Sequence, residues 1–310
     1  MKTVEVGFHV DGDVWEPEQM KAVEDYGFDI MTTGEHILFF RPILDVITVL
    51  AYAAAVTTRI KLVPSTLILP LRHPTMMAKE LISLDILSKG RLTASVGIGG
   101  DYPREFQACG VPIKERGVRA NEGIEIMRKY WSGERFDYNG KIFQLEDVDM
   151  LPLPYQPGGP DLWVCGRSDP AMRRAARLGD GWQPYMYTAE QFHDSVGKVK
   201  DFAAEADREL PDDFAFTSFM YVSMHEDVET ARNNAIEQMT FRFNLPAEKI
   251  VDRYCAYGPD ERIIENLESY VKAGANKLIV ALIMPPEERM NYVERFATNI
   301  LPELQKMKAG

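Results

Sequence analysis

The feature that most constrains the fold is a regular alternation of short β-branched or aromatic runs with longer stretches of helical periodicity. The strand-like runs occupy residues 4–10, 28–33, 59–69, 91–100, 161–166, 181–186, 214–224 and 276–283. Each run precedes a helical pattern, and two such patterns follow the seventh run. Strands that alternate with helices pair in parallel through right-handed crossovers. Eight such units in 310 residues predict one closed (β/α)₈ TIM barrel over residues 1–310, in preference to a doubly wound sheet.

Two segments are less regular than the rest. The run at 181–186, "GWQPYM", is short and contains a proline, so it is the weakest of the expected strands. Residues 133–160 carry turn signals and alternation instead of helical periodicity, and "YNGK" is typical of a tight hairpin turn. We therefore expect a short hairpin excursion before strand five.

Composition excludes several classes of function. The formal net charge of −12 argues against nucleic acid or an anionic membrane as a partner. The three cysteines have no CxxC spacing, which predicts neither a zinc site nor a disulfide framework. The first residues lack a signal-peptide core, and the apolar stretch at 44–58 is too short for a membrane span. We expect a soluble, cytoplasmic protein without a bound metal.

In a barrel, functional residues gather at the carboxyl ends of the strands. Four unusual segments fall there: Glu35–His36 after strand two, "PST" within strand three, "GIGGD" after strand four and "CGRSDP" after strand five. We therefore expect these segments to meet at the barrel mouth.

His36 is the candidate general acid–base, with Glu35 or Asp101 tuning it. The alternative is a structural histidine. We place the substrate near four residues around the mouth: His9, Trp15, Phe39 and Phe40. For the two phenylalanines the alternative is core or subunit packing.

Two glycine-containing turns are candidates for cofactor binding. Gly99 and Gly100 suit a backbone that approaches a ligand, or else a flexible transition from strand to loop. They do not form a dinucleotide fingerprint, because the sixth position is Tyr102. In "CGRSDP", free backbone N–H groups at a helix start beside Arg167 form an anion site, unless this is an ordinary capped helix with a solvated arginine.

The chain resembles the bacterial luciferase-like superfamily of (β/α)₈ oxidoreductases, which use FMN or the deazaflavin coenzyme F420. The resemblance covers nearly the whole chain and is densest from residue 59 to 182. Three stretches carry it: "TTRIKLVPSTLILPLRHPTMMAKELISLDILSKGRLTASVGIGG", "EFQACGVPIKERGVRANEGIEIMRKYWSGE" and "LWVCGRSDPAMRRAARLGDGW".

This resemblance implies a site. The ring system lies across the barrel mouth, with His36 facing its reactive edge. A non-prolyl cis peptide that supports the ring falls at Ser65–Thr66. Cofactor phosphate lies near Gly166, Arg167 and Ser168, in agreement with the anion site inferred from the residues alone.

The choice of cofactor rests on departures from bacterial luciferase. Its α chain has a histidine where this chain has Ile37, and an arginine where this chain has Ile98. Compact length and the His36-to-Phe40 spacing look more like the deazaflavin branch, whose aromatic residue is usually tryptophan and whose acid past strand four loosely matches Asp101. The deazaflavin tail carries extra carboxylates, which should need cationic neighbours at the barrel rim. Arg72, Lys79, Arg116 and Arg167 are the candidates, and the alternative for each is a solvated surface charge.

We therefore expect F420-dependent hydride transfer to or from a small organic substrate. The alternative is an FMNH₂-dependent monooxygenase that uses O₂, and a lesser one is a non-catalytic flavin-binding protein. A homodimer is expected, and a separate flavin or F420 reductase is a further possible partner. The substrate itself is not readable, because specificity lies in the loops at 9–16, 36–43 and 99–116.

Overall fold

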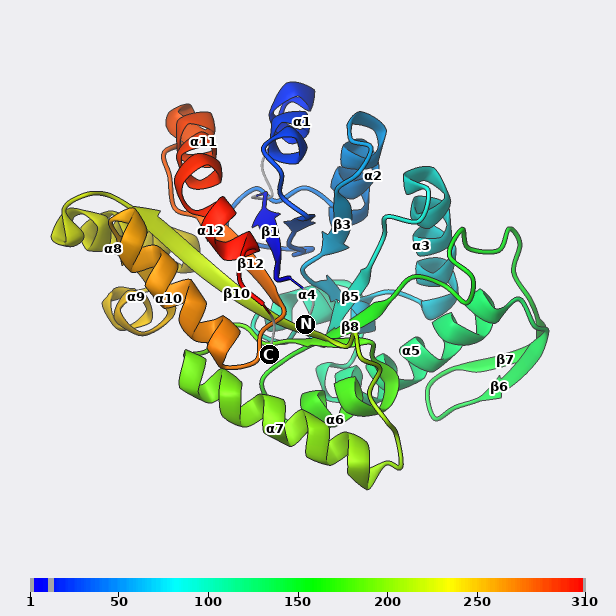
Figure 1. The fold of residues 1–310 in the computed structure, drawn as a ribbon. Coiled ribbons are helices and arrows are strands. Elements are labelled where there is room, and N and C mark those ends of the chain that lie inside the picture. The colour runs from blue at the N-terminus through cyan, green and yellow to red at the C-terminus, as the bar shows by residue number, and fades with distance from the viewer. Residues whose placement is uncertain (1–2, 11–13, 309–310) are drawn as a thin grey trace.

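The computed structural model describes residues 3–10 and 14–308, which form a parallel barrel surrounded by helices (Figure 1). The barrel strands are β1 (Glu5–His9), β2 (Ile30–Thr33), β3 (Lys61–Pro64), β4 (Leu67–Ile68), β5 (Ala94–Gly97), β8 (Leu162–Cys165), β9 (Gly181–Gln183), β10 (Ala215–Met224), β11 (Cys255–Gly258) and β12 (Lys277–Leu282). Their order is β3-β2-β1-β12-β10-β9-β8-β5-β4, with β11 beside β10.

The sheet closes because β3 and β4 are two parts of one strand position. They are separated by Ser65–Thr66, and the two ends of the sheet order therefore meet at this point. A parallel bridge between Leu62 and Leu92 joins β3 to the start of β5. The predicted barrel is confirmed, and so is its weakest strand, β9.

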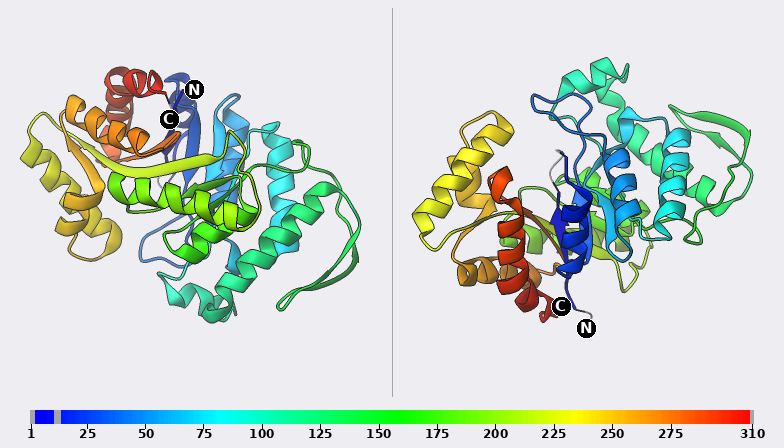
Figure 2. Two further views of the ribbon diagram at one scale, coloured as in Figure 1. Left: turned by 60° about the horizontal axis from the view of Figure 1, so that its bottom comes forward. Right: turned by 90° about the horizontal axis from the view of Figure 1, so that it is seen from above.

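Most of the helices lie outside the barrel, as the two further views show (Figure 2). They are α1 (Pro17–Asp25), α2 (Val46–Val56), α3 (Pro74–Ser88), α4 (Pro103–Ala108), α5 (Arg116–Ser132), α6 (Asp169–Leu178), α7 (Ala189–Glu205), α8 (Val228–Phe243), α9 (Glu248–Tyr254), α10 (Asp260–Lys272), α11 (Arg289–Asn299) and α12 (Leu301–Gln305). Single 3₁₀ turns span Leu69–Leu71, Ile113–Glu115 and Pro286–Glu288. Side-chain capping defines several starts: the Asp45 carboxylate accepts from the Thr48 N–H at 2.9 Å, for example.

Alternation along the strands divides the core into two layers. Phe8 and Val96 face the surrounding helices, whereas Ile30, Phe219 and Ile279 belong to a second cluster that includes the barrel interior. At position 7 a Cβ atom would lie 2.4 Å from the Cδ1 atom of Ile279 and 3.0 Å from the Cβ atom of Ile30, so a larger residue there would displace the interior side chains that pack against β1.

The segment at 133–160 contains the predicted hairpin. β6 (Phe136–Asn139) pairs antiparallel with β7 (Gln144–Val148), and Figure 1 shows the pair standing out beside α5. The Glu122 carboxylate on α5 accepts backbone N–H groups of Lys141 and Phe143 at 2.7 and 3.0 Å, which fixes the turn against the helix.

One strand was missed by the sequence analysis. β11 pairs with the far half of β10, in register from Tyr221–Cys255 to Met224–Gly258, whereas two helical stretches were expected after residue 224. β11 has only four residues and is bounded by α9 and α10, so it leaves too short a pattern to detect. On this edge of β10, β9 pairs only with Ala215 and Phe216. β11 covers the remaining part of the edge.

Candidate active site at the barrel mouth

His36 lies in the loop after β2 and contacts a buried carboxylate from another part of the chain. Its Nδ1 atom is 3.2 Å from the Oε1 atom of Glu105, which lies on α4 and is 1% exposed. The Glu105 carboxylate also accepts the backbone N–H groups of Ile37 and Leu38, at 2.6 and 3.1 Å. Because a carboxylate accepts hydrogen bonds, Nδ1 carries the hydrogen in this contact, which leaves Nε2 to exchange a proton.

Aromatic rings hold the other side of His36. The Phe39 ring stacks on the imidazole with centroids 4.1 Å apart and planes 10° from parallel. Phe40 packs on Phe39 at 4.2 Å, and the Tyr102 ring lies 6.1 Å from His36 and 5.2 Å from Phe39. The imidazole is therefore restrained by stacking and by its hydrogen bond, while its side chain stays 28% exposed.

The acids named from the sequence lie elsewhere, which corrects the expected partner of His36. Glu35 is buried, and its carboxylate accepts the Ile68 N–H at 2.6 Å and the Arg72 Nε–H at 3.1 Å. It thereby ties the His36 loop to β4. Asp101 is exposed, and Glu105, four residues further along, is the acid that reaches His36.

The turn after β5 packs tightly against β4. Gly99 and Gly100 have φ values of 56° and 116°, in the left-handed region that favours glycine. A Cβ atom on Gly99 would lie 2.7 Å from Cγ2 of Ile68. The predicted non-prolyl cis peptide at Ser65–Thr66 is present, at the junction between β3 and β4.

A chain of polar side chains crosses the barrel at the same level. The Gln183 amide nitrogen donates to the Ser65 Oγ atom at 2.8 Å, and the Cys165 Sγ atom lies 3.8 Å from Oε1 of Gln183 and 3.0 Å from Oγ of Ser95. Burial raises the pKa of the Cys165 thiol, which keeps it protonated and able to donate. These contacts fix the direction of the Ser65 hydroxyl beneath the mouth.

The loop after β8 leads directly into α6. Ser168 is the N-cap residue, but its side chain makes no capping bond, and Pro170 lies in the first turn. Gly166 has a φ of 141°, and its carbonyl accepts from the Trp182 indole N–H at 2.9 Å. The Arg167 carbonyl accepts from the Tyr187 hydroxyl at 3.0 Å, while its side chain is exposed. The backbone of this loop is thus fixed by hydrogen bonds to its carbonyl oxygens.

The four expected rim cations have different surroundings. Arg72 is ion-paired with Glu35, Asp45 and Glu80, so its charge is neutralised within the protein. The Lys79 ammonium donates to the carbonyl of Leu151.

Arg116, in contrast, lies against the glycine turn. A Cβ atom at Gly100 would approach its Nε atom to 3.2 Å. That Nε–H is buried and has no hydrogen-bond partner among the described residues.

The expected substrate residues divide into two sets. His9 lies in the barrel, with Nδ1 2.9 Å from the Thr32 hydroxyl and its ring 5.1 Å from that of Phe219. Trp15 is only 1% exposed and packs on Phe8 in the layer beneath the helices, so its assignment to the pocket was wrong. Trp15 belongs to a loop, where strand alternation gives no indication of which way a side chain faces.

A second aromatic group, absent from the sequence prediction, lies beside His9. Tyr185 follows β9, and its hydroxyl lies 3.1 Å from that of Tyr221 on β10, with Phe219 and Phe243 packed around the pair. Burial holds the pKa of Tyr185 well above its usual range, so this hydroxyl stays protonated. In the sheet order β9 and β10 lie far from β2, which places this group across the mouth from His36.

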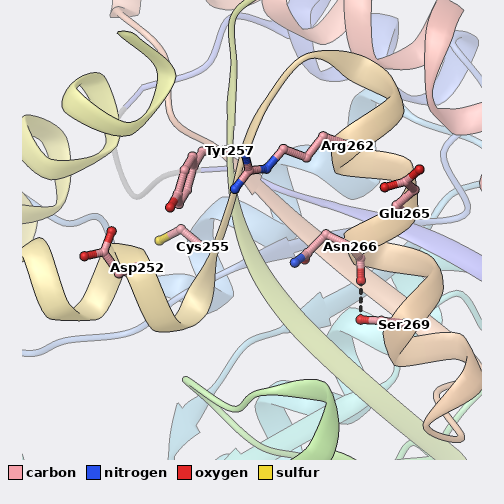
Figure 3. Close-up of a pocket in the computed structure, with 7 residues that line it drawn as sticks. All are labelled: Asp252, Cys255, Tyr257, Arg262, Glu265, Asn266 and Ser269. Atoms are coloured by element: carbon pink, nitrogen blue, oxygen red, sulfur yellow. Dashed lines mark hydrogen bonds between the residues drawn. The ribbon is translucent and has the colours of Figure 1, made fainter. Parts of the chain in front are cut away.

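A separate cleft of about 350 Å³ lies between α9, β11 and α10 (Figure 3). Its lining residues are Asp252, Cys255, Tyr257, Arg262, Glu265, Asn266 and Ser269. Asp252 pairs with Arg232 at 2.6 Å, and the Arg262 guanidinium packs 5.0 Å from the centre of the Tyr257 ring. Asp252 and Arg262 therefore already have partners within the protein.

Within residues 3–10 and 14–308, no group of three or more His, Cys, Asp or Glu side chains is arranged to hold a metal ion. Over the same residues, no helix combines the length and apolar character needed to cross a bilayer.

Comparison with known proteins identifies relatives over most of the chain. A family model described as luciferase-like monooxygenase matches residues 16–248. An uncharacterised protein of Mycobacterium bovis is 29% identical over 236 residues, which is 75% of this chain and 77% of that protein. F420-dependent glucose-6-phosphate dehydrogenase of Nocardia farcinica is 25% identical, over 99% of this chain and 100% of that enzyme.

A solved structure of an F420-dependent secondary alcohol dehydrogenase has the same fold. It superposes with a TM-score of 0.85 at 18% identity, and the match covers 98% of this chain and 99% of the other.

Proposed function

This chain belongs to the luciferase-like monooxygenase family of oxidoreductases, and we propose that it uses the deazaflavin coenzyme F420 to transfer hydride to or from a small organic substrate. The observation that carries the proposal is the pairing of His36 with Glu105 at 3.2 Å, at the carboxyl ends of the strands. An acid–base group held in this way suits the proton that accompanies hydride transfer at a carbon–oxygen bond.

The residues around the mouth fit an anionic, planar cofactor. The buried Nε–H of Arg116 lacks a partner among the described residues and lies against the Gly99–Gly100 turn. A buried cationic donor of this kind favours a negatively charged ligand. The Ser168 hydroxyl makes no capping hydrogen bond, so together with the start of α6 it would offer a second contact for an anion. The Ser65–Thr66 bulge and the Ser65 hydroxyl would lie beneath the ring.

A bound deazaflavin supplies a carbon centre, in place of flavin N5, that exchanges hydride and reacts poorly with oxygen. His36 would take up or release the proton on the substrate oxygen through Nε2. Glu105 would keep the imidazole in the required tautomer and orientation. Phe39 would keep the ring plane fixed through its stacking contact.

The second candidate is an FMN-dependent monooxygenase, which the description of the matching family favours. In that reaction O₂ is consumed, and reduced flavin must be supplied by a separate reductase. His36 would then remove a substrate proton or steer oxygen transfer, with the same contacts to Glu105 and Phe39.

The two reactions are distinguished by incubating the protein with a panel of alcohols, aldehydes and ketones. With F420 we expect the deazaflavin absorbance to bleach or recover when substrate is added, without oxygen consumption. The same panel is run with FMN, NADH and a flavin reductase in an oxygen electrode. Substrate-dependent oxygen uptake with FMN, together with no change in F420 absorbance, would overturn the hydride-transfer proposal.

A further inference from the structure

A cleft of about 220 Å³ lies between α5 and α6, which run beside one another on one side of the barrel (Figures 1 and 2). We call it the arginine cleft; its lining residues are Asn121, Glu125, Pro170, Arg173, Arg174, Arg177 and Leu178. Three of them are arginines and one is an acid, in a chain whose formal net charge is −12. The local charge is therefore opposite to that of the whole molecule.

Arg174 is a buried cation whose hydrogen bonds are incomplete. The residue is 7% exposed, and its Nε–H donates to the Asn121 side-chain oxygen at 2.6 Å. Its Nη2–H donates to the Gly117 carbonyl at 3.2 Å, but Nη1 has no partner within the described part of the chain. Both partners are neutral, and burial lowers the pKa of this guanidinium. A buried guanidinium without a counter-ion is costly, so an anion in the cleft would stabilise it.

The exposed arginines of the cleft differ in their pairing. Arg173 forms an ion pair with Glu205 and packs over the Phe202 ring at 3.8 Å. Arg177 is exposed, and no carboxylate of the described residues lies within ion-pair distance of it. The acid of the cleft, Glu125, accepts a hydrogen bond from the Tyr138 hydroxyl at 2.7 Å. Positive charge that an incoming ligand can use therefore comes chiefly from Arg174 and Arg177.

The cleft begins at the proposed phosphate loop. Pro170, which lines it, is two residues beyond Ser168 at the start of α6. On the other side, Arg174 bonds to Gly117, which directly follows Arg116 beside the glycine turn. From Pro170 to Arg177 the helix rises about 10 Å. A fully extended peptide covers at most about 3.5 Å per residue, so a tail of about three glutamyl units reaches this length.

We propose that the arginine cleft binds the carboxylates of the glutamyl tail of the deazaflavin cofactor, with Arg177 as the direct anion contact and the buried charge of Arg174 behind it. This inference rests on the proposed use of F420. It assigns the tail a path away from the mouth along the α5–α6 groove. It also distinguishes this cofactor from FMN, which ends at its phosphate and has no carboxylates to place there.

The test measures dissociation constants by fluorescence titration of the wild-type protein with deazaflavin that carries none, one or several glutamyl residues. We expect affinity to increase with tail length, and to lose that dependence as ionic strength rises from about 20 to 300 mM, because exposed charge contacts are screened. Arg177→Gln should weaken binding of the long-tailed form roughly two- to fivefold, and Arg177→Glu roughly three- to tenfold. Binding of the tail-less form should not change.

Arg135→Gln is the matched control, since it removes an exposed arginine from the β6–β7 region that pairs with Asp147 and Asp149. It should leave every dissociation constant unchanged, and thermal unfolding should show that all variants are folded. Equal affinity for all tail lengths, or equal losses in the Arg177 and Arg135 variants, would overturn the tail site while leaving deazaflavin binding intact. If no deazaflavin form binds, the proposed function itself fails, and the tail site with it.

Discussion

The Glu105 carboxylate joins two parts of the mouth: it lies 3.2 Å from the Nδ1 atom of His36 and accepts the backbone N–H of Ile37 at 2.6 Å. One buried acid on α4 therefore orients the candidate acid–base and fixes the loop that carries it. If this arrangement serves catalysis, mutation of His36 and mutation of Glu105 should have different effects on turnover and on the loop.

His36→Asn should slow turnover by roughly 10²- to 10⁴-fold, the usual effect of losing a general acid–base. The amide keeps a polar group against Glu105 but cannot exchange a proton, so the dissociation constant of the cofactor should hardly change. Steady-state kinetics and fluorescence titration measure the two quantities. His193→Asn, which changes an exposed histidine on α7, is the control. Unchanged turnover in a folded His36→Asn protein would make His36 a structural residue.

Glu105→Gln and Glu105→Ala should differ in their effects. Glutamine keeps an oxygen for the Ile37 and Leu38 N–H groups, whereas alanine leaves both without an acceptor and frees the loop. We expect kcat to fall in both variants, because both lose the charge of Glu105. KM should rise strongly only in the alanine variant. Proteolysis within residues 36–44 should be faster in the alanine variant alone. Identical KM values and cleavage rates in the two variants would contradict a loop-holding role.

Substitution in the turn after β5 tests its role through stability and cofactor binding, without a measurement of turnover. Gly99→Ala places a Cβ atom 2.7 Å from Ile68 at a φ of 56°, so we expect destabilisation by about 1–2 kcal/mol and weaker cofactor binding. Gly197→Ala is the matched change inside α7, where the new methyl group meets no atom within 4 Å. It should stabilise the protein by about 0.5–1 kcal/mol. Denaturant unfolding and cofactor titration of the two variants test this contrast.

Much of the fold can be predicted from the strand and helix patterns of the sequence, but the partner of His36 cannot. The alternation of strands and helices, the hairpin at 133–160 and Ser65–Thr66 were all accessible from the sequence, the last through family resemblance. Glu105 was not, because it lies 69 residues from His36 in a helix of only six residues. Proximity in sequence favoured Glu35, yet adjacent side chains in an extended loop diverge, and Glu35 faces Arg72 instead.

Stability should respond to pH through Glu24 on α1. Burial alone would raise the pKa of this carboxyl, but the N–H groups of Ile60, Arg59 and Thr58 donate to it and hold the pKa below its ordinary value. A lowered folded-state pKa means that the contribution is complete above the unfolded-state value and disappears as pH falls through the folded-state value.

Glu24→Gln should therefore lower the unfolding free energy by about 1–3 kcal/mol at pH 7. The difference from wild type should shrink once the pH falls below the ordinary range for a carboxyl group. Urea unfolding at neutral and acidic pH measures the gap. Glu18→Gln, an exposed change in the first turn of the same helix, is the control. A gap that stays constant with pH would show that the charge of Glu24 is not involved.

The use of F420 in preference to FMN is tested by the relative affinity of the wild-type protein for the two cofactors, each titrated anaerobically under the same conditions. We expect F420 to bind at least about tenfold more tightly, because its carboxylates and phosphate would interact with the charges of Arg116, Arg174 and Arg177 together. Tighter binding of FMN than of F420, at low and at high salt, would contradict it.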